Sequence, residues 1–338
     1  FFKEYKDSLI YLERTQADGK VREGLIGMVD LEDYSYEKDS TTLIRATEKT
    51  VIERIPPRVK VRENAKLELP HIMILIDDDK KEIIEKLKQK VTEKEKVYDF
   101  DLMKNGGHIK GYVLKDKDAN ETLTKLEKLA DKELFNKKYN LKDKEVLLFA
   151  MGDGNHSLAT AKACYENLKK TMPEDEYLKN PARYAVVELV NLHSPALEFE
   201  AIHRVLFNVN TKELFKELEK FYDISYEKTA GQKVDFVTSE KEGTFWIKNP
   251  KSNIPVGSLQ LFLDEYLKKH EGKIDYVHGE DVTKELGHKA GNVGFILEAM
   301  SKNELFKTVT LDGALPRKTF SMGHSNDKRY YLEARRIK

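Results

Sequence analysis

The sequence predicts an α+β protein with a mixed sheet that carries hairpins and flanking helices. Three observations predict it. Alternating apolar and polar segments flank tight-turn residues near the amino terminus, apolar runs at 146–151 and 183–191 have the length of buried strands, and charged stretches with helical spacing lie between such runs. Because hairpins are mixed with strands that helices separate, we expect a mixed sheet rather than a purely parallel one.

Length and composition favour two domains. The chain has 338 residues, of which 40% are apolar, and this is enough for two ordinary hydrophobic cores. Ser194-Pro195 is the best boundary, so we expect one domain over 1–193 and a second α+β domain over 194–338. The chain begins Phe1-Phe2 without Met, and we expect further residues upstream of it.

Charge and cysteine content limit the class of partner. Lys plus Arg and Asp plus Glu both number 59, which argues against a broad nucleic-acid or anionic-membrane surface. No apolar run is long enough to span a bilayer, and no signal peptide is visible. The single cysteine, Cys164, excludes an internal disulfide. We expect a cytoplasmic protein with a small-molecule ligand, no nucleic-acid partner and no membrane partner.

The first half of the chain alternates between strand and helix patterns. The strands are expected at 8–14 and 22–31 around the Asp18-Gly19 turn, at 70–76, and at 97–114 on both sides of Asn105-Gly106-Gly107. Amphipathic helices are expected at 80–91 and 121–138, and a turn-broken segment at 44–65 around Pro56-Pro57.

The second half follows the same pattern. Strands are expected at 199–207, 234–247, 274–277 and 293–297, and helices at 212–222, 258–270 and up to Gly287. A polar tail over 318–336 contains His324, Lys328 and Arg329.

The segment Val146–Leu168, VLLFAMGDGNHSLATAKACYENL, is the leading candidate for an active site. It predicts a strand, a glycine loop and a helix for which Ser157 is the N-cap. A helix start after Gly152 and Gly154 presents backbone N–H groups to an anion. Asp153 suits a metal-bound phosphate or a proton-accepting role. Ordinary turn chemistry explains the loop equally well.

The side chains around Gly154 add chemistry to this loop. Asn155, His156 and Ser157 place an amide, an imidazole and a hydroxyl at the carboxyl end of one strand. Taken singly, His156 is as well explained by packing and Ser157 by capping.

Two further groups of residues are candidates for binding. Arg45, Glu48 and Lys49 precede the Pro-Pro break, where cations suit phosphate oxygens, although a solvated segment is the alternative. His203 and Arg204 sit in an apolar run. With His278 they suggest a second-domain site, or else a satisfied buried pair.

Five stretches resemble the family called domain of unknown function 1015. GDGNHSLATA is similar to its Asp-Gly-His-His-Arg loop, and further matches lie in GLIGMVDLEDY, IRATEKT, AIHRVL and IDYVHG, in the family's order. That loop is in turn similar to the loop of the ParB/sulfiredoxin superfamily, whose members bind nucleotides and include partition proteins, sulfinic-acid reductases and free-serine kinases. The resemblance therefore implies a nucleotide site on a ParB/sulfiredoxin-like core.

Carried over by position, the resemblance assigns the motif aspartate to Asp153, its glycine to Gly154 and its second histidine to His156. Two positions depart, because Asn155 replaces the first histidine and Ser157 replaces the arginine. Loss of that arginine removes a bidentate phosphate clamp, so Arg45, Lys49 or Lys162 must substitute for it.

The function expected is magnesium-dependent phosphoryl transfer from ATP or ADP to a small hydroxylated metabolite such as serine. In this hypothesis the loop backbone holds phosphates, Asp153 binds the metal or accepts the hydroxyl proton, and His156 contacts the transferring group. The alternative is a nucleotide-sensing regulator or partition-like protein, with homodimer closure and no transfer. Sulfiredoxin-like redox chemistry is disfavoured because Cys164 lies on the apolar face of its helix.

Overall fold

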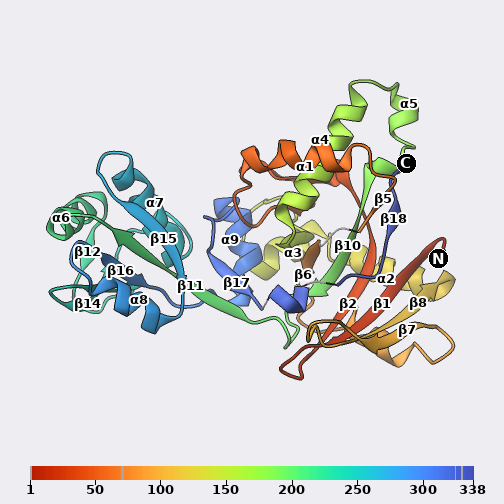
Figure 1. Ribbon diagram of the computed structural model, residues 1–338, viewed down its shortest axis with the longest axis horizontal. Helices are drawn as coiled ribbons and strands as arrows, with labels where there is room; N and C mark the ends of the chain where they lie inside the picture. Colours follow the sequence, from red (N-terminus) through yellow and green to blue (C-terminus); the bar gives the residue numbers. More distant parts are fainter. Residues whose placement is uncertain (1, 70–71, 324, 329) are drawn as a thin grey trace. The chain divides into compact units, whose positions relative to one another are not determined.

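The computed structural model describes residues 2–69, 72–323, 325–328 and 330–338 (Figure 1). They form two compact units. The first runs to Glu198 and includes Gly323–Lys338, and the second is Phe199–Met322. The division thus falls just after the boundary expected at 193, and the end of the chain returns to the first unit. Within the described residues, no helix is both long and apolar enough to cross a bilayer.

The first unit is built on a large sheet in which the structure describes nine strands, in the order β3-β4-β9-β6-β10-β2-β1-β8-β7. Their bounds are β1 Ser8–Thr15, β2 Val21–Asp30, β3 Tyr34–Ser35, β4 Ile44–Arg45, β6 Met73–Ile76, β7 Lys96–Asp101, β8 His108–Lys115, β9 Phe149–Asp153 and β10 Tyr184–Asn191. Separately, β5 Leu67–Glu68 pairs with β18 Arg335–Arg336.

Both parallel and antiparallel pairs occur in the large sheet, which confirms the predicted mixed α+β class. The hairpins β1/β2 and β7/β8 are antiparallel, as their Gly turns predict. The neighbours β6 and β10 are parallel, whereas β9 is antiparallel to β6, with Asp153 opposite Met73. The carboxyl end of β9 therefore lies at the amino end of β6.

The helices of the first unit are α1 Ile55–Arg62, α2 Asp116–Lys128, α3 Lys132–Tyr139, α4 Asn155–Lys169 and α5 Glu174–Tyr177. In Figure 1, α1 lies alongside α4. The expectation that Pro56-Pro57 breaks the chain is wrong. Both prolines stand in the first turn of α1, where a missing N–H costs nothing.

Two predicted helices differ from the structure. The segment 80–91 contains only a short 3-10 helix, η3 Glu85–Gln89. The Asp78 carboxylate accepts hydrogen bonds from the N–H groups of Glu82 and Ile83, and these bonds hold a turn where the helix was expected to begin. The expected helix 121–138 is two helices, and Asp131 starts the second by capping Leu134. The strand expected at 70–76 is confirmed as β6, although Pro70 lies outside the described residues.

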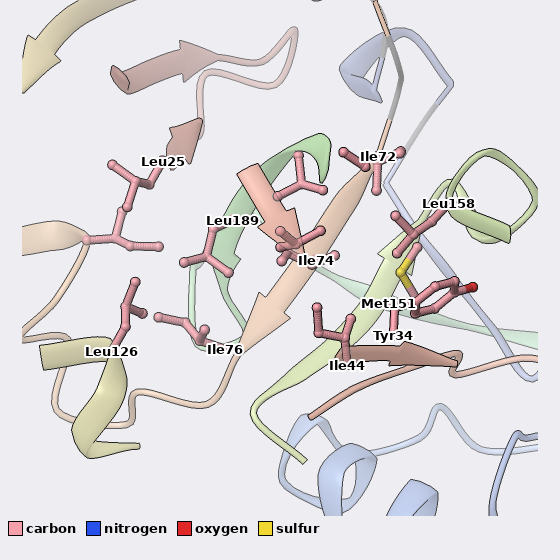
Figure 2. Close-up of a cluster of buried hydrophobic side chains, with 14 of the residues drawn as sticks. Leu25, Tyr34, Ile44, Ile72, Ile74, Ile76, Leu126, Met151, Leu158 and Leu189 are labelled. Carbon is pink, nitrogen blue, oxygen red and sulfur yellow. The ribbon is translucent and has the colours of Figure 1, made fainter. Parts of the chain in front are cut away.

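One face of the large sheet is apolar and carries the core. Figure 2 shows Leu25, Ile74 and Leu189 from three neighbouring strands gathered with Leu126 of α2. On the same face Leu158 of α4 packs into this core. The apolar spacing of α4 is therefore explained by burial.

The opposite face of the sheet buries charge. Arg22 of β2 makes a two-point salt bridge to Glu188 of β10, at 2.9 and 3.1 Å, and Tyr331 also donates to Glu188. A Cβ atom on Gly24 would lie 2.5 Å from Glu188 Oε1, so a larger residue there would have to displace the Glu188 carboxylate from its salt bridge. The carboxyl-terminal residues thus complete the first unit over this face.

The second unit has its own sheet, with the path β12-β14-β13-β16-β11-β15 and β17 paired to β11. Its strands are β11 Phe199–Phe207, β12 Ile224–Ser225, β13 Gln232–Thr238, β14 Glu242–Ile247, β15 Lys273–His278, β16 Val293–Ile296 and β17 Phe320–Met322. Its helices are α6 Thr211–Phe221, α7 Pro255–Leu267, α8 Glu280–Gly287 and α9 Leu305–Asp312. They include the strands and helices predicted for this region, and they add β12, α9 and β17, which the sequence did not predict.

Candidate functional site

The glycine loop joins β9 directly to α4. Gly152 and Asp153 end the strand, and Gly154 has φ 86° and ψ 21°, a left-handed conformation that favours glycine. The predicted N-cap is wrong, because the helix begins two residues before Ser157. The Ser157 N–H donates to the Gly154 carbonyl at 2.8 Å, which places Ser157 inside the first turn.

The start of α4 presents backbone donors beside a carboxylate. The N–H groups of Asn155 and His156 open the helix, and such groups have no acceptor within their own helix. Asp153 Oδ1 accepts from the Gly154 N–H at 2.6 Å, and Asp153 Oδ2 lies 3.2 Å from Lys328 Nζ. The Asp153 side chain is 34% exposed, so solvent reaches the carboxylate.

His156 is held as a neutral ring. Its Nε2 accepts the Val51 N–H at 3.3 Å. Burial lowers the pKa of His156, and the nearby cations Arg58 and Arg54 lower it further. Since Nε2 is an acceptor, the proton of the neutral imidazole is on Nδ1, which is left as a donor.

The segment from Arg45 to Val51 lies against this loop. Thr47 donates to the Met151 carbonyl at 2.7 Å, which ties the segment to β9 just before the glycines. Glu48 is half-buried and Lys49 is exposed. The segment therefore brings the Lys49 backbone to the neighbourhood of the loop, with its ammonium in solvent.

Arg45 and Lys162 are held by other groups. The Arg45 guanidinium donates to the carbonyls of Thr41, Thr42, Glu145 and Val146, and burial lowers its pKa to about 10. Lys162 Nζ donates to the Leu31 carbonyl at 2.8 Å and lies 2.9 Å from Glu166. Both geometries favour a role in holding the backbone.

Two polar atoms at the loop are buried without a hydrogen-bond partner among the described residues, Thr50 Oγ1 and Asn155 Oδ1. Thr50 is only 6% exposed. A buried polar group left unsatisfied costs about 1–3 kcal/mol and calls for an explanation such as a bound molecule. Asn155 is the first residue of α4, and Thr50 precedes Val51, whose N–H donates to His156, so both atoms belong to segments that meet at the start of the helix. Their lack of partners favours a polar ligand at this point.

In the second unit, β11 and β15 carry the other predicted residues. His203 Nδ1 accepts the Leu297 N–H at 3.2 Å, and burial lowers the pKa of His203. Arg204 is fully buried and donates to Gln260 and to the carbonyls of Ile202 and Arg317. His278 is exposed on the neighbouring strand. This geometry agrees with the alternative of a satisfied buried pair.

Sequence reasoning missed one contributor to the loop site and one buried polar cluster elsewhere in the first unit. Lys328, in the 3-10 helix η6 Ser325–Lys328, reaches Asp153 from far along the chain, and no local pattern signals such a contact. His324 and Arg329 lie outside the described residues.

The second omission is a cluster at the carboxyl ends of β6 and β10. Asp77 Oδ1 lies 2.6 Å from His193 Nε2 and 2.9 Å from Lys138 Nζ, and Asp77 Oδ2 accepts from Tyr139. Polar residues placed directly after two buried strands were the available signal.

Metal binding at the loop depends on one carboxylate. Within the described residues, no group of three His, Cys, Asp or Glu side chains is placed to hold a metal ion. Mg²⁺ is commonly bound by one or two carboxylates together with substrate phosphates, and the exposed Asp153 fits that mode. Burial raises the pKa of Cys164, which argues against a reactive thiolate.

The fold and the loop thus define a two-unit α+β protein with a strand, glycine turn and helix as its candidate ligand site. The chain belongs to the family described as "Protein of unknown function (DUF1015)", whose model matches residues 1–266. No curated protein matches the sequence.

Three solved structures are similar to the chain at low identity. A conserved hypothetical protein from Pyrococcus furiosus is 9% identical with a TM-score of 0.43, covering 89% of this chain and 91% of that one. A free serine kinase in complex with AMP is 10% identical with a TM-score of 0.46, covering 88% and 87%. A mutant free serine kinase in complex with ADP is also 10% identical with a TM-score of 0.46, covering 95% and 92%.

Proposed function

We propose that the protein is a nucleotide-binding phosphotransferase whose active site is the loop from Gly152 to Ser157. One observation carries the proposal. The left-handed turn at Gly154 opens α4 beside two buried polar atoms, Thr50 Oγ1 and Asn155 Oδ1, that lack partners in the described chain. Phosphate oxygens and nucleotide hydroxyls supply the acceptors and donors that such a site needs.

Phosphate binding falls to the backbone and to lysines. The N–H groups of Asn155 and His156 donate to phosphate oxygens, with the helix dipole favouring the negative charge. Lys328 already lies at the loop, and Lys49 is the exposed cation on the neighbouring segment. These lysines take the place of the arginine that Ser157 replaces in the motif.

Asp153 and His156 act on the reacting groups. Asp153 is the only carboxylate proposed to hold Mg²⁺, which would neutralise phosphate charge, and it is also the candidate acceptor for a hydroxyl proton. His156 is neutral and has Nδ1–H to donate to a transferring phosphoryl group. The proposed acceptor is a small hydroxylated metabolite such as serine, on the strength of the loop's resemblance to serine kinases.

Ligand-induced stabilisation tests nucleotide binding. ATP, ADP and AMP are added with and without Mg²⁺, and the melting temperature is measured for the wild type, Asp153→Asn and the matched control Asp79→Asn, an exposed carboxylate at the opposite end of β6. A ligand at a hundredfold excess over its Kd adds about 2.7 kcal/mol of stability. We expect the magnesium-dependent part of the shift for the wild type and the control only. Equal shifts in all three proteins would remove Asp153 from the site.

Turnover tests the transfer step. ATP or ADP is mixed with serine and with other hydroxylated metabolites, and phosphorylated product is measured. We expect product from the wild type and a loss of at least tenfold in Asp153→Asn, as for removal of a group that contacts the reacting atoms.

The second candidate is a nucleotide-sensing regulator that does not transfer phosphate. The observation that favours it is the replacement of the motif arginine by Ser157, whose N–H is already used within the first turn. It predicts nucleotide binding without product, and a nucleotide-dependent homodimer detectable by light scattering. The cytoplasmic location stays a prediction in both cases.

A further inference from the structure

The first unit contains a cavity that neither the glycine loop nor the proposed transfer uses. It has a volume of about 360 Å³ and lies between the apolar face of the large sheet and α2. Leu25, Ile74 and Leu189 from the sheet and Leu126 from α2 line it, and all four are labelled in Figure 2. Small-molecule sites of mostly apolar lining begin at about this size.

One apolar side chain of the cavity wall is open to solvent. Leu123 of α2 lines the cavity and is 45% exposed. Gly27 of β2 also lines it, so one position of the floor has no side chain. An apolar body therefore gains burial against Leu123 and the apolar lining when it enters.

All the charged side chains in the described lining of the cavity are acidic. Of the eighteen described residues that line it, three are charged, and these are Asp30, Asp33 and Glu127. Asp30 is neutralised by Arg183, whose Nη2 lies 2.6 Å from Asp30 Oδ2. Asp33 and Glu127 are exposed and form no ion pair with any described residue. Burial, with the nearby Asp30, raises the pKa of Asp33, although the charges of Arg183 and Lys162 act in the opposite direction.

We propose that this cavity binds an apolar amine, a molecule with a small hydrocarbon or aromatic body and one ammonium group. The leucine-lined walls take the apolar body, and the carboxylates of Asp33 and Glu127 take the ammonium. Nucleotides and fatty acids do not fit, because the described lining offers no Lys, Arg or His to an anion. The proposal is independent of the phosphotransferase assignment.

Three probes of one shape and different charge test the proposal. They are 2-phenylethylamine, 2-phenylethanol and 3-phenylpropionate, titrated calorimetrically into the full chain at pH 7.5. We expect saturable binding of the amine, at least tenfold weaker binding of the alcohol and none of the acid. Equal binding of all three, or no binding of the amine, overturns the proposal.

Variants locate the binding. The double variant Asp33→Asn/Glu127→Gln is expected to weaken binding of the amine about tenfold, because it removes two partly exposed charge interactions with the ammonium. Glu133→Gln, an exposed carboxylate on α3, is the matched control and is expected to bind normally. Ala130→Phe fills the cavity wall and is expected to abolish binding. Amine binding that survives Ala130→Phe would place the site elsewhere. Nucleotide-dependent melting shifts are expected to be unchanged in all these variants.

Discussion

The two ends of the central strands carry two aspartates in opposite surroundings. Asp153 ends β9 at the amino end of β6, and Asp77 follows the carboxyl end of β6. The Asp153 side chain is 34% exposed, whereas that of Asp77 is 7% exposed. Asp77 is enclosed by Tyr139, His193 and Lys138, while Asp153 meets the loop backbone and Lys328.

The difference separates a structural carboxylate from a functional candidate. Asp77 ties α3 and the chain after β10 to the end of β6, and its neighbours leave little access for a ligand. Asp153 is open to solvent beside backbone donors and the unpartnered atoms of Thr50 and Asn155. Removing Asp77 should therefore cost stability, and removing Asp153 should cost binding.

The largest expected effect is from Asp77→Ala. It removes the buried carboxylate to which Tyr139 donates, and we expect this to cost about 2–3 kcal/mol of unfolding free energy, because Tyr139 is itself buried. Urea unfolding measures the loss. The exposed neighbour in Asp79→Ala should change stability by no more than about 0.5 kcal/mol. A loss below about 1 kcal/mol in Asp77→Ala would refute the structural role.

The sequence predicted the fold better than the candidate site. The Gly turns of both hairpins and the apolar run of β11 are local signals, and the structure confirms them. The helix expected at 80–91 is absent from that described segment because Asp78 accepts hydrogen bonds from Glu82 and Ile83. The spacing of apolar residues, from which the helix was predicted, gives no sign of these bonds. Lys328 and the Asp77 cluster depend on contacts between distant segments, so spacing alone could not place them.

Gly154→Ala should have the next largest effect. At φ 86° an alanine is strained by about 1–2 kcal/mol, and the start of α4 shifts to relieve that strain. We expect this loss of stability in urea unfolding together with a weaker nucleotide-dependent melting shift. Gly279→Ala, at a φ of 88° in the second unit, is the matched control. It should lose stability while the nucleotide shift is retained.

The contributions of Asp77 and His156 to folding stability should be lost at different pH values as the solution is acidified. Burial alone would raise the pKa of Asp77, but hydrogen bonds from Tyr139, His193 and Lys138 outweigh it and lower the pKa. Its contribution is present above the unfolded value of about 3.9 and is lost as pH falls through the lower folded value. Stability measured below pH 4 should therefore fall more steeply in the wild type than in Asp77→Asn.

His156 affects folding stability at a higher pH than Asp77, because its pKa in the folded protein is lowered from an unfolded value of about 6.5. The neutral ring is favoured by folding, so its contribution is full above pH 6.5 and is lost as pH falls toward the lowered value. His156→Gln should remove this part of the pH dependence. An unchanged profile between pH 7 and pH 5 would mean that the ring titrates normally.

The smallest effect on stability should come from Asp153→Asn, and this variant sharpens the comparison most. A pair that is one-third exposed contributes at most about 1 kcal/mol, and an amide oxygen still accepts the Gly154 N–H. If Asp153 serves a ligand, the variant keeps its melting temperature but loses the magnesium-dependent part of the nucleotide shift. A variant as unstable as Asp77→Ala would instead make both aspartates structural, and the phosphate site would then have to depend on the backbone of α4 and on Lys328 alone.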